Sequence, residues 1–374
     1  MALFSVAAFA APKTYELTSP NGKFKMAVEN GEGLTYTVAY DGDLLIDRSE
    51  INMLLTDGTI YGGVQKAPKV TRRTVNQTLP AITYKKAQVV DNFNEMTLKY
   101  KEFSVIFRAY DEGVAYRFVS HAKAPFKVES ECAEFNFAQD WNAWIPYVKQ
   151  NEETLVTQYF NSFENVYKYH PVSEYDQTHL SFTPMMVDAP KGRKIVIAEA
   201  DLMNYPGMFL YNEDGKTTLK GRFAPVPKRL EQGGHNELQM LVPERENYIA
   251  ALDGACSFPW RIITVSENDA QMADNDMVWK LSTPSDPNAD WSWVKPGKVA
   301  WDWWNDWNIY GVDFRAGINN DTYKNYIDFA SKYGIEYIIM DEGWARNTRD
   351  PFNSNPDINL PELIKYGKSK NVDI

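Results

Sequence analysis

The feature that most constrains this chain is a change in its hydrophobic period near residue 283. From Lys13 to about Ser282, apolar and polar residues alternate in short runs such as Phe24, Met26 and Val28. Alternation of this kind predicts half-buried strands, and turn dipeptides separate the runs. The clearest of these turn signals are Asn21-Gly22, Asp41-Gly42, Asp57-Gly58 and Asp214-Gly215. Many short strands without a long helical pattern predict a large antiparallel β-sandwich over residues 12–282.

A linker is predicted over residues 283–297, because its prolines and small polar residues suit neither a strand nor a helix. After it, a short apolar run at Lys298–Trp301 predicts a strand. Apolar residues at helical spacing then predict a helix over Tyr323–Tyr333, capped by Asn320 or Asp321 and closed by Gly334.

The run Ile335–Met340 predicts a parallel strand that is buried on both faces. A second helix is expected to begin near Pro361 and end near Asn371, and Val372–Ile374 is expected to open a third strand. The order β-α-β-α-β fits a doubly wound sheet or a (β/α)₈ barrel. No glycine-rich phosphate loop follows the first strand, which disfavours the dinucleotide-binding type. A full barrel needs about 250 residues, so residues 298–374 are expected to form an incomplete TIM-type barrel, its first two repeats, in a truncated chain.

Charge and composition restrict the partners of the chain. A net charge of −11 argues against nucleic acid and anionic membrane surfaces, and no internal apolar run is long enough for membrane insertion. Residues 1–11 are apolar and contain the cleavage pattern Ala8-Phe9-Ala10 near their end, which predicts a signal-peptide remnant and therefore a periplasmic or secreted protein. An apolar first strand is the alternative. With four His and no Cys-x-x-Cys, a zinc site is unsupported, and Cys132 and Cys256 could either pair or remain thiols.

Aromatic and acidic side chains follow both predicted barrel strands, where barrel enzymes place their active sites. Six of the 11 Trp residues lie between Trp291 and Trp307. Indole rings stack on the apolar faces of sugars, while carboxylates accept hydrogen bonds from sugar hydroxyls. For Asp302, capping of a turn is the alternative role. The predicted sugar-binding residues are Trp301, Asp302, Trp303, Trp304, Asp341, Glu342 and Trp344.

Two segments around the predicted helix carry a resemblance to a known family. Residues 295–304 read Lys-Pro-Gly-Lys-Val-Ala-Trp-Asp-Trp-Trp, and residues 337–344 read Tyr-Ile-Ile-Met-Asp-Glu-Gly-Trp. Together they resemble glycoside hydrolase family 97, and residues 178–186 and 198–202 resemble the N-terminal domain of that family. The Asp-Glu-Gly-Trp motif also occurs in other α-galactosidase barrels, so the combination and its order carry the resemblance.

The resemblance implies an exo-acting, calcium-dependent α-glycosidase of Bacteroidetes type, exported to the periplasm. The family contains retaining α-galactosidases and inverting α-glucosidases. We expect a retaining α-galactosidase that acts on terminal α-linked galactose of oligosaccharides. The inverting α-glucosidase is the alternative within the family, and a non-catalytic carbohydrate-binding protein or a β-sandwich adhesion domain are alternatives of other classes.

By position, Glu342 resembles the family carboxylate that binds hydroxyls of the non-reducing sugar. Glu164 resembles the single calcium ligand that the β domain donates, with an ordinary surface acid as the alternative. The family's nucleophile and proton donor come from later barrel strands, so no catalytic residue is predicted in this chain. The oligomeric state stays open.

Overall fold

The computed structural model describes residues 12–81, 84–149, 154–161, 163–286 and 288–374. Contacts divide the chain into two units. The first comprises the described residues up to Leu230 together with Val242–Pro284, and the second comprises Glu231–Leu241 and Ser285–Ile374. The predicted signal-peptide remnant lies outside the described residues. Residues 231–241, which were expected to belong to the β-sandwich, group with the second unit.

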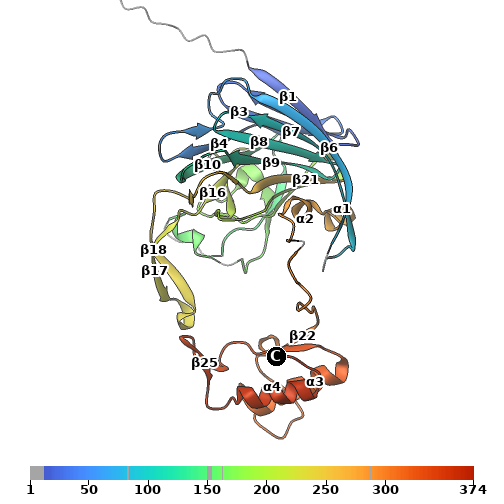
Figure 1. Ribbon diagram of the computed structural model, residues 1–374, viewed down its shortest axis with the longest axis vertical. Helices are drawn as coiled ribbons and strands as arrows, with labels where there is room; N and C mark the ends of the chain where they lie inside the picture. Colours follow the sequence, from blue (N-terminus) through green and yellow to red (C-terminus); the bar gives the residue numbers. More distant parts are fainter. Residues whose placement is uncertain (1–11, 82–83, 150–153, 162, 287) are drawn as a thin grey trace, which may run out of the picture. The chain divides into compact units, whose positions relative to one another are not determined.

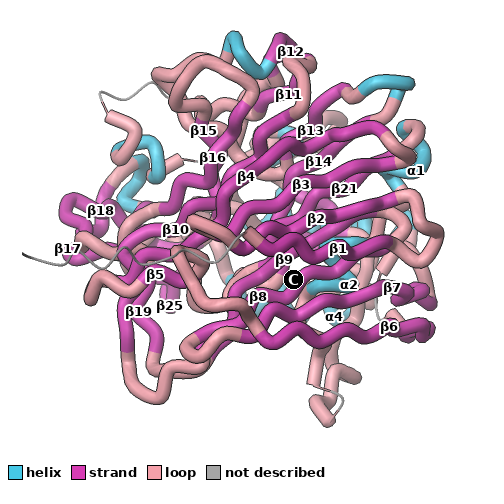
Figure 2. Tube along the Cα trace, turned by 90° about the horizontal axis from the view of Figure 1, so that it is seen from above, coloured by secondary structure: helices cyan, strands magenta, loops and turns pink. Residues whose placement is uncertain are grey.

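The first unit contains two large antiparallel sheets, which confirms the predicted β-sandwich (Figures 1 and 2). One sheet has the strand order β1 (Lys13–Thr18), β2 (Phe24–Asn30), β3 (Leu34–Tyr40), β4 (Asp43–Leu55), β10 (Phe126–Phe137), β16 (Thr218–Phe223) and β15 (Met208–Tyr211), with β5 (Ile60–Tyr61) beside β4 and β19 (Ala250–Leu252) beside β10. The other has the order β12 (Lys168–Pro171), β11 (Asn142–Ile145), β13 (Met185–Asp188), β14 (Lys194–Ala200), β21 (Trp260–Ser266), β9 (Gly113–Ser120), β8 (Phe103–Tyr110), β7 (Gln88–Lys99) and β6 (Lys69–Pro80), with β20 (Cys256–Ser257) beside β9.

The two-residue period of the sequence reappears as a burial pattern. In β2, Phe24, Met26 and Val28 are buried while Lys25 is exposed, because successive side chains of a strand point to opposite faces. At the turn from β3 to β4, Asp41 and Gly42 both have positive φ, as a two-residue hairpin turn requires. The glycines of the other predicted turns also have positive φ: Gly22, Gly58 and Gly215.

The core lies between the two sheets and is rich in aromatic rings. Tyr36 of the first sheet and Tyr116 of the second have ring centroids 5.5 Å apart. They belong to a large cluster that includes Phe24, Phe107 and Phe135. The aromatic excess of the first unit therefore serves packing, which is the usual role of such rings.

A buried group of charges also joins the two sheets. Arg261 on β21 donates two hydrogen bonds of 2.8 Å to Glu131 on β10 and one of 2.7 Å to Glu199 on β14. The Arg261 side chain is 1% exposed. Burial opposes its charge, but the two carboxylates raise the pKa of Arg261 above its ordinary value, so it stays a cation.

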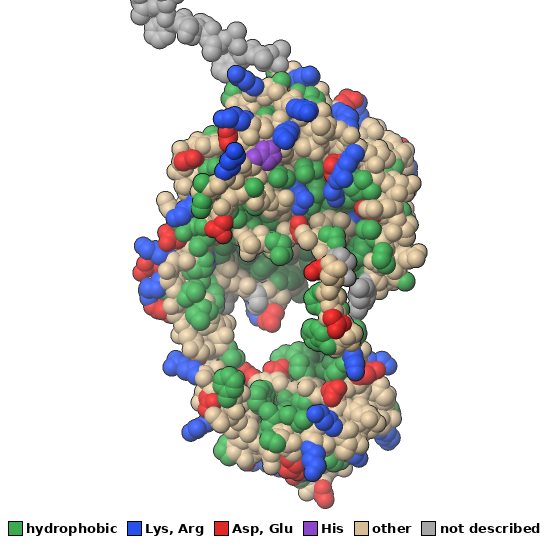
Figure 3. Space-filling model, in the orientation of Figure 1, with side chains coloured by type: hydrophobic (Ala, Val, Ile, Leu, Met, Phe, Trp, Pro, Cys, Tyr) green, Lys and Arg blue, Asp and Glu red, His purple; other side chains and the backbone are tan. Residues whose placement is uncertain are grey.

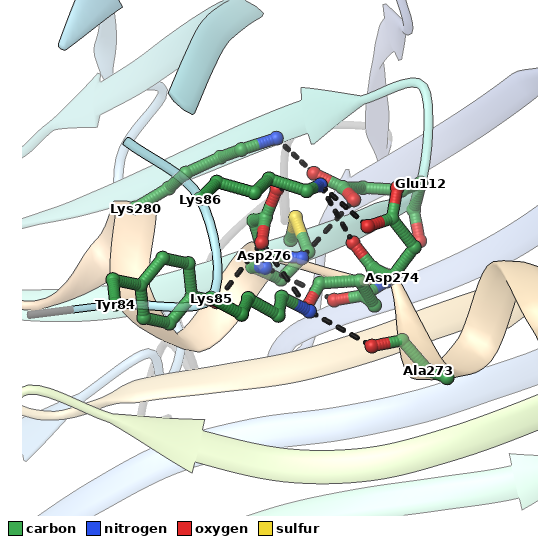
Figure 4. A network of polar contacts seen from close by, with 10 residues as sticks. Tyr84, Lys85, Lys86, Glu112, Ala273, Asp274, Asp276 and Lys280 are labelled. Carbon is green, nitrogen blue, oxygen red and sulfur yellow. Dashed lines mark hydrogen bonds and ion pairs between the residues drawn. The ribbon is translucent and has the colours of Figure 1, made fainter. Parts of the chain in front are cut away.

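Two short helices, α1 (Asp269–Ala273) and α2 (Met277–Leu281), pack on strands β14 and β21 of the second sheet. Met277 and Leu281 pack against Trp260 in a second buried cluster. Outside it, charged side chains fasten the helices to neighbouring loops (Figure 4). Asp276 accepts a hydrogen bond of 2.6 Å from Lys86 and one of 2.9 Å from the Tyr84 hydroxyl.

The second unit is built around a parallel pair of strands, with α3 packed on this pair and α4 packed on α3. Residue Asp373 adds a parallel bridge to Tyr337, at the position of the predicted third strand. Two further strands, β24 and β25, form a small antiparallel hairpin, and β17 pairs with β18 as a separate ribbon. The bounds are β17 (Pro227–Gly233), β18 (Gln239–Arg245), β22 (Val299–Trp301), α3 (Asn320–Tyr333), β23 (Tyr337–Ile339), β24 (Ala345–Asn347), β25 (Asp350–Ser354) and α4 (Leu360–Ser369).

The helix α3 matches the predicted one, with a different N-cap. The side chain of Asn319, one residue before the predicted caps, accepts a hydrogen bond from the Thr322 amide. Gly334 closes the helix with φ 66°, as predicted. Strand β23 is shorter than the predicted run, and Ile339 is exposed, so burial on both faces is not realised among the described residues. Every described helix is too short or too polar to span a lipid bilayer.

Candidate sugar-binding site

The two predicted clusters lie at one edge of the parallel pair. Trp301 is opposite Ile339 in the register, so the residues after both strands emerge together. Asp302 follows β22, and Asp341 comes shortly after β23. The backbone amide of Asp341 donates to the Asp302 carboxylate at 3.2 Å, so the strand ends are joined directly.

Asp302 is 1% exposed, and its carboxylate is committed to the protein. Besides the Asp341 amide, it accepts hydrogen bonds from the Trp303 amide at 2.6 Å and from the Tyr323 hydroxyl at 2.7 Å. Burial and this bond to Asp302 raise the pKa of Tyr323 well above its ordinary value, so the hydroxyl stays a donor. These contacts give Asp302 a structural role, while its predicted contact with sugar stays a prediction.

The three predicted tryptophans form a ring cluster. The centroid of Trp301 is 5.3 Å from that of Trp303 and 5.9 Å from that of Trp304. The Trp301 indole Nε1 donates a hydrogen bond of 2.7 Å to Oδ2 of the Asp341 carboxylate. The Trp304 side chain is 75% exposed. Figure 3 shows hydrophobic side chains gathered on the visible face of the second unit. Trp301 and Trp304 line a hollow of about 820 Å³ whose other walls include Tyr310 and Phe329.

Glu342 and Trp344 lie at a different hollow, of about 500 Å³. Pockets of about 300–1,000 Å³ are the size that encloses small ligands. The structure thus brings Glu342 and Trp344 together but places Trp301 and Trp304 around a separate hollow, with Asp341 between the two groups. This smaller hollow, which we call the Glu342 cavity, is lined by Leu238, Trp307, Ile318, Glu342, Gly343, Trp344, Ala345, Arg346, Asn347, Thr348, Pro351 and Asn355.

The loop that carries Glu342 is held in a defined shape. Asp341 accepts a hydrogen bond of 2.6 Å from the Glu342 amide. Asn355 donates its side-chain amide to the Gly343 carbonyl and its backbone amide to the Trp344 carbonyl. Gly343 has φ 98°, a backbone conformation that residues with a side chain rarely adopt, and the end of the Ile318 side chain would have to move to admit a Cβ, so glycine is favoured there. Because the loop is already ordered, little conformational entropy is lost when a ligand binds to the Glu342 carboxylate.

Two residues of the Glu342 cavity were not among the predicted sugar-binding residues. The first is Trp307, which ends the tryptophan-rich run noted in the sequence; with Asp306 it forms two consecutive non-glycine residues at positive φ, 52° and 51°. The indole Nε1 of Trp307 is buried and has no hydrogen-bond partner among the described residues. Strained backbone clusters at functional sites, so this outlier adds to the case for the cavity. The second is Leu238, which comes from far along the chain; the only local signal was the turn dipeptide Gly233-Gly234.

Glu164 is in the first unit, and its side chain is 74% exposed. Its carboxylate is 3.8 Å from the Lys149 ammonium. Within the described ranges, no group of three or more His, Cys, Asp or Glu side chains is arranged to hold a metal ion. Calcium takes six to eight oxygen ligands, so Glu164 could supply only one of them, and the described residues do not complete a calcium site.

The sequence matches models of known protein families in two regions. Residues 17–284 match the model of the glycosyl-hydrolase 97 N-terminal domain, and residues 303–374 match the glycoside hydrolase 97 model. The chain belongs to glycoside hydrolase family 97.

Relatives of this family 97 chain include two curated proteins. A retaining α-galactosidase of Bacteroides thetaiotaomicron (strain VPI-5482) is 45% identical over 367 residues, which is 97% of this chain and 55% of the relative. A probable retaining α-galactosidase of Streptomyces bingchenggensis (strain BCW-1) is 24% identical, over 96% of this chain and 51% of the relative. The chain therefore spans about half the length of the curated relatives it matches.

Two solved structures show the same fold over 96% of this family 97 chain at 22% identity. One is a family 97 enzyme from Pseudoalteromonas sp. strain K8 in complex with acarbose, with a TM-score of 0.78 over 53% of that chain. The other is a β-arabinopyranosidase, with a TM-score of 0.75 over 54% of that chain.

Proposed function

We propose that the protein is a retaining α-galactosidase that removes terminal α-linked galactose from oligosaccharides. The observation that carries this proposal is the 45% identity, over 97% of the chain, with a retaining α-galactosidase. The Glu342 cavity supports it, since a carboxylate beside a Trp ring suits a sugar with both hydroxyls and an apolar face. We also propose that residues 298–374 are the first two repeats of a (β/α)₈ barrel, supported by β22, α3, β23 and α4 in that order.

The role proposed for this chain is to bind and orient the terminal sugar. The Glu342 carboxylate accepts hydrogen bonds from hydroxyls, and Trp344 offers an apolar ring face beside it. A retaining glycosidase also needs a nucleophile and an acid/base about 5 Å apart. We assign neither of these two bond-breaking roles to a residue of this chain. Calcium binding with Glu164 as one ligand, and export to the periplasm or the medium, belong to the same proposal.

The test is an assay of the whole gene product on p-nitrophenyl α-galactoside and α-glucoside, with the anomer of the released sugar followed by NMR. We expect hydrolysis of the galactoside with retained configuration. Glucoside hydrolysis with inversion would support the alternative α-glucosidase. Sugar binding without hydrolysis of either substrate would support a carbohydrate-binding protein and overturn the proposal.

A further inference from the structure

The connection between β17 and β18 supplies a wall of the Glu342 cavity. Residues Glu231–Leu241 at this connection belong to the second unit. The tip is a defined turn, in which Gly234 and Glu237 have positive φ and the Gln232 side chain donates a hydrogen bond of 3.0 Å to the Glu237 carbonyl. We call residues 231–241 the hairpin tip.

An ion pair links the hairpin tip to the turn between β24 and β25. Arg349 lies in the turn between β24 and β25, and its guanidinium is 2.6 Å from the Glu237 carboxylate. The neighbouring residues Arg346, Asn347 and Thr348 line the cavity, so the pair joins two of its walls. Both charged side chains are more than half exposed, so the pair can be removed by mutation without burying an unpaired charge.

Leu238 is the residue of the hairpin tip that faces the cavity. It is 55% exposed and offers only apolar contact. An enzyme recognises the identity of a sugar through hydrogen bonds to its hydroxyls, because a missing partner leaves a buried polar group unpaired. Glu342 can form such bonds and Leu238 cannot. An apolar contact accepts sugars that differ in their hydroxyl groups. Such a contact suits the leaving-group sugar, which differs between substrates, better than the terminal galactose, which every substrate shares.

We propose that the hairpin tip is the specificity wall for the leaving-group sugar. Leu238 contacts the apolar face of that sugar, and the Glu237–Arg349 pair holds Leu238 in place. This inference rests on the proposed α-galactosidase function. The wall acts only on substrates whose leaving group is large enough to reach it.

The test compares two substrates on the whole gene product. α-Galactosyl fluoride has a single atom as its leaving group, whereas an α-1,6-galactosyl disaccharide has a sugar. We expect Leu238→Ala to lower kcat/KM for the disaccharide by about tenfold more than kcat/KM for the fluoride, the loss typical of a few apolar contacts. Leu230→Ala is the matched control, because Leu230 is on β17, is equally exposed at 55%, and does not line the cavity.

The ion pair is tested separately by charge reversal. Glu237→Arg should raise the disaccharide KM, and the double variant Glu237→Arg/Arg349→Glu should restore it. Equal losses on both substrates, or no loss on either, would overturn the specificity wall while leaving the α-galactosidase intact. A whole gene product that hydrolyses neither substrate would instead refute the proposed function itself. Circular dichroism of each variant separates a folding defect from a change in specificity.

Discussion

At the scale of single residues, Glu342 is the carboxylate on which the proposed sugar recognition depends most. Its loop is fixed by Asp341 and Asn355, so the side chain is presented without a large entropic cost. Glu342→Gln should lower kcat/KM on p-nitrophenyl α-galactoside by about 10–100-fold, because a charge-assisted hydrogen bond is worth about 1.5–3 kcal/mol. Steady-state kinetics of the whole gene product measure this. Glu362→Gln, a surface change in the same unit, is the control, and unchanged kinetics in Glu342→Gln would remove it from the site.

Glu164 is the second single residue whose proposed role, calcium binding, can be tested by substitution. Glu164→Ala should weaken calcium binding by roughly tenfold or more, because affinity follows the number and charge of the ligands. Calorimetric titration of the whole gene product measures the affinity. Glu174→Ala, which removes an exposed carboxylate elsewhere in the first unit, should have no effect. Identical titrations for Glu164→Ala and the wild type would show that Glu164 is an ordinary surface acid.

At the scale of elements, α1 and α2 depend on the charged contacts in Figure 4. Asp276 is central, with Lys86 and Tyr84 as its donors. Burial alone would raise the pKa of Asp276, but these hydrogen bonds outweigh it and lower the pKa below its ordinary value of 3.8. Because the unfolded state then binds the proton more readily, the stabilisation is complete above pH 3.8 and is lost as the pH falls through the lower, folded pKa.

We therefore expect Asp276→Asn to cost about 1–2 kcal/mol of unfolding free energy at pH 6 and less at pH 3. Urea denaturation at both pH values measures the difference between wild type and variant. Asp269→Asn, at the exposed first position of α1, is the control. A difference that stays constant between the two pH values would mean that the Asp276 charge does not stabilise these helices.

Elements were also the level at which sequence prediction worked best. The alternation in Phe24, Met26 and Val28 and the helical spacing of Tyr323, Tyr326 and Ile327 are local patterns, and local patterns decide whether a segment forms a strand or a helix. The site was harder to predict for a physical reason. Asp302 has the side chain of a sugar ligand, but its partner Tyr323 is 21 positions away, and only the fold shows that they meet. Leu238 lines the same cavity as Trp344 although more than 100 positions separate them, and no periodic pattern in the sequence indicates it.

At the scale of the whole molecule, the buried charges of Arg261, Glu131 and Glu199 connect the two sheets of the first unit. In Glu131→Gln the buried Arg261 keeps Glu199 as its counter-charge but loses the charged acceptor of its two hydrogen bonds to Glu131. Because a hydrogen bond to a charged group is worth about 1.5–3 kcal/mol, Glu131→Gln should destabilise the first unit by about 1.5–3 kcal/mol. Chemical denaturation followed by circular dichroism measures this. Glu129→Gln lies on the same strand but is exposed, so it should be neutral, and equal stability of the two variants would contradict a role for the buried charges.

The Glu237–Arg349 pair has a consequence that follows from its exposure to water. Dissolved ions screen such a pair, and the screening length falls from about 8 Å at 0.15 M salt to about 3 Å at 1 M. Added sodium chloride should therefore lower the preference for the disaccharide over the fluoride in the wild type. A Glu237→Gln/Arg349→Gln variant should keep a constant, lower preference, and a salt response identical to that of the wild type would place the effect elsewhere. The ionic strength around the protein would then tune which oligosaccharides it favours, without any change in the residues that hold the terminal sugar.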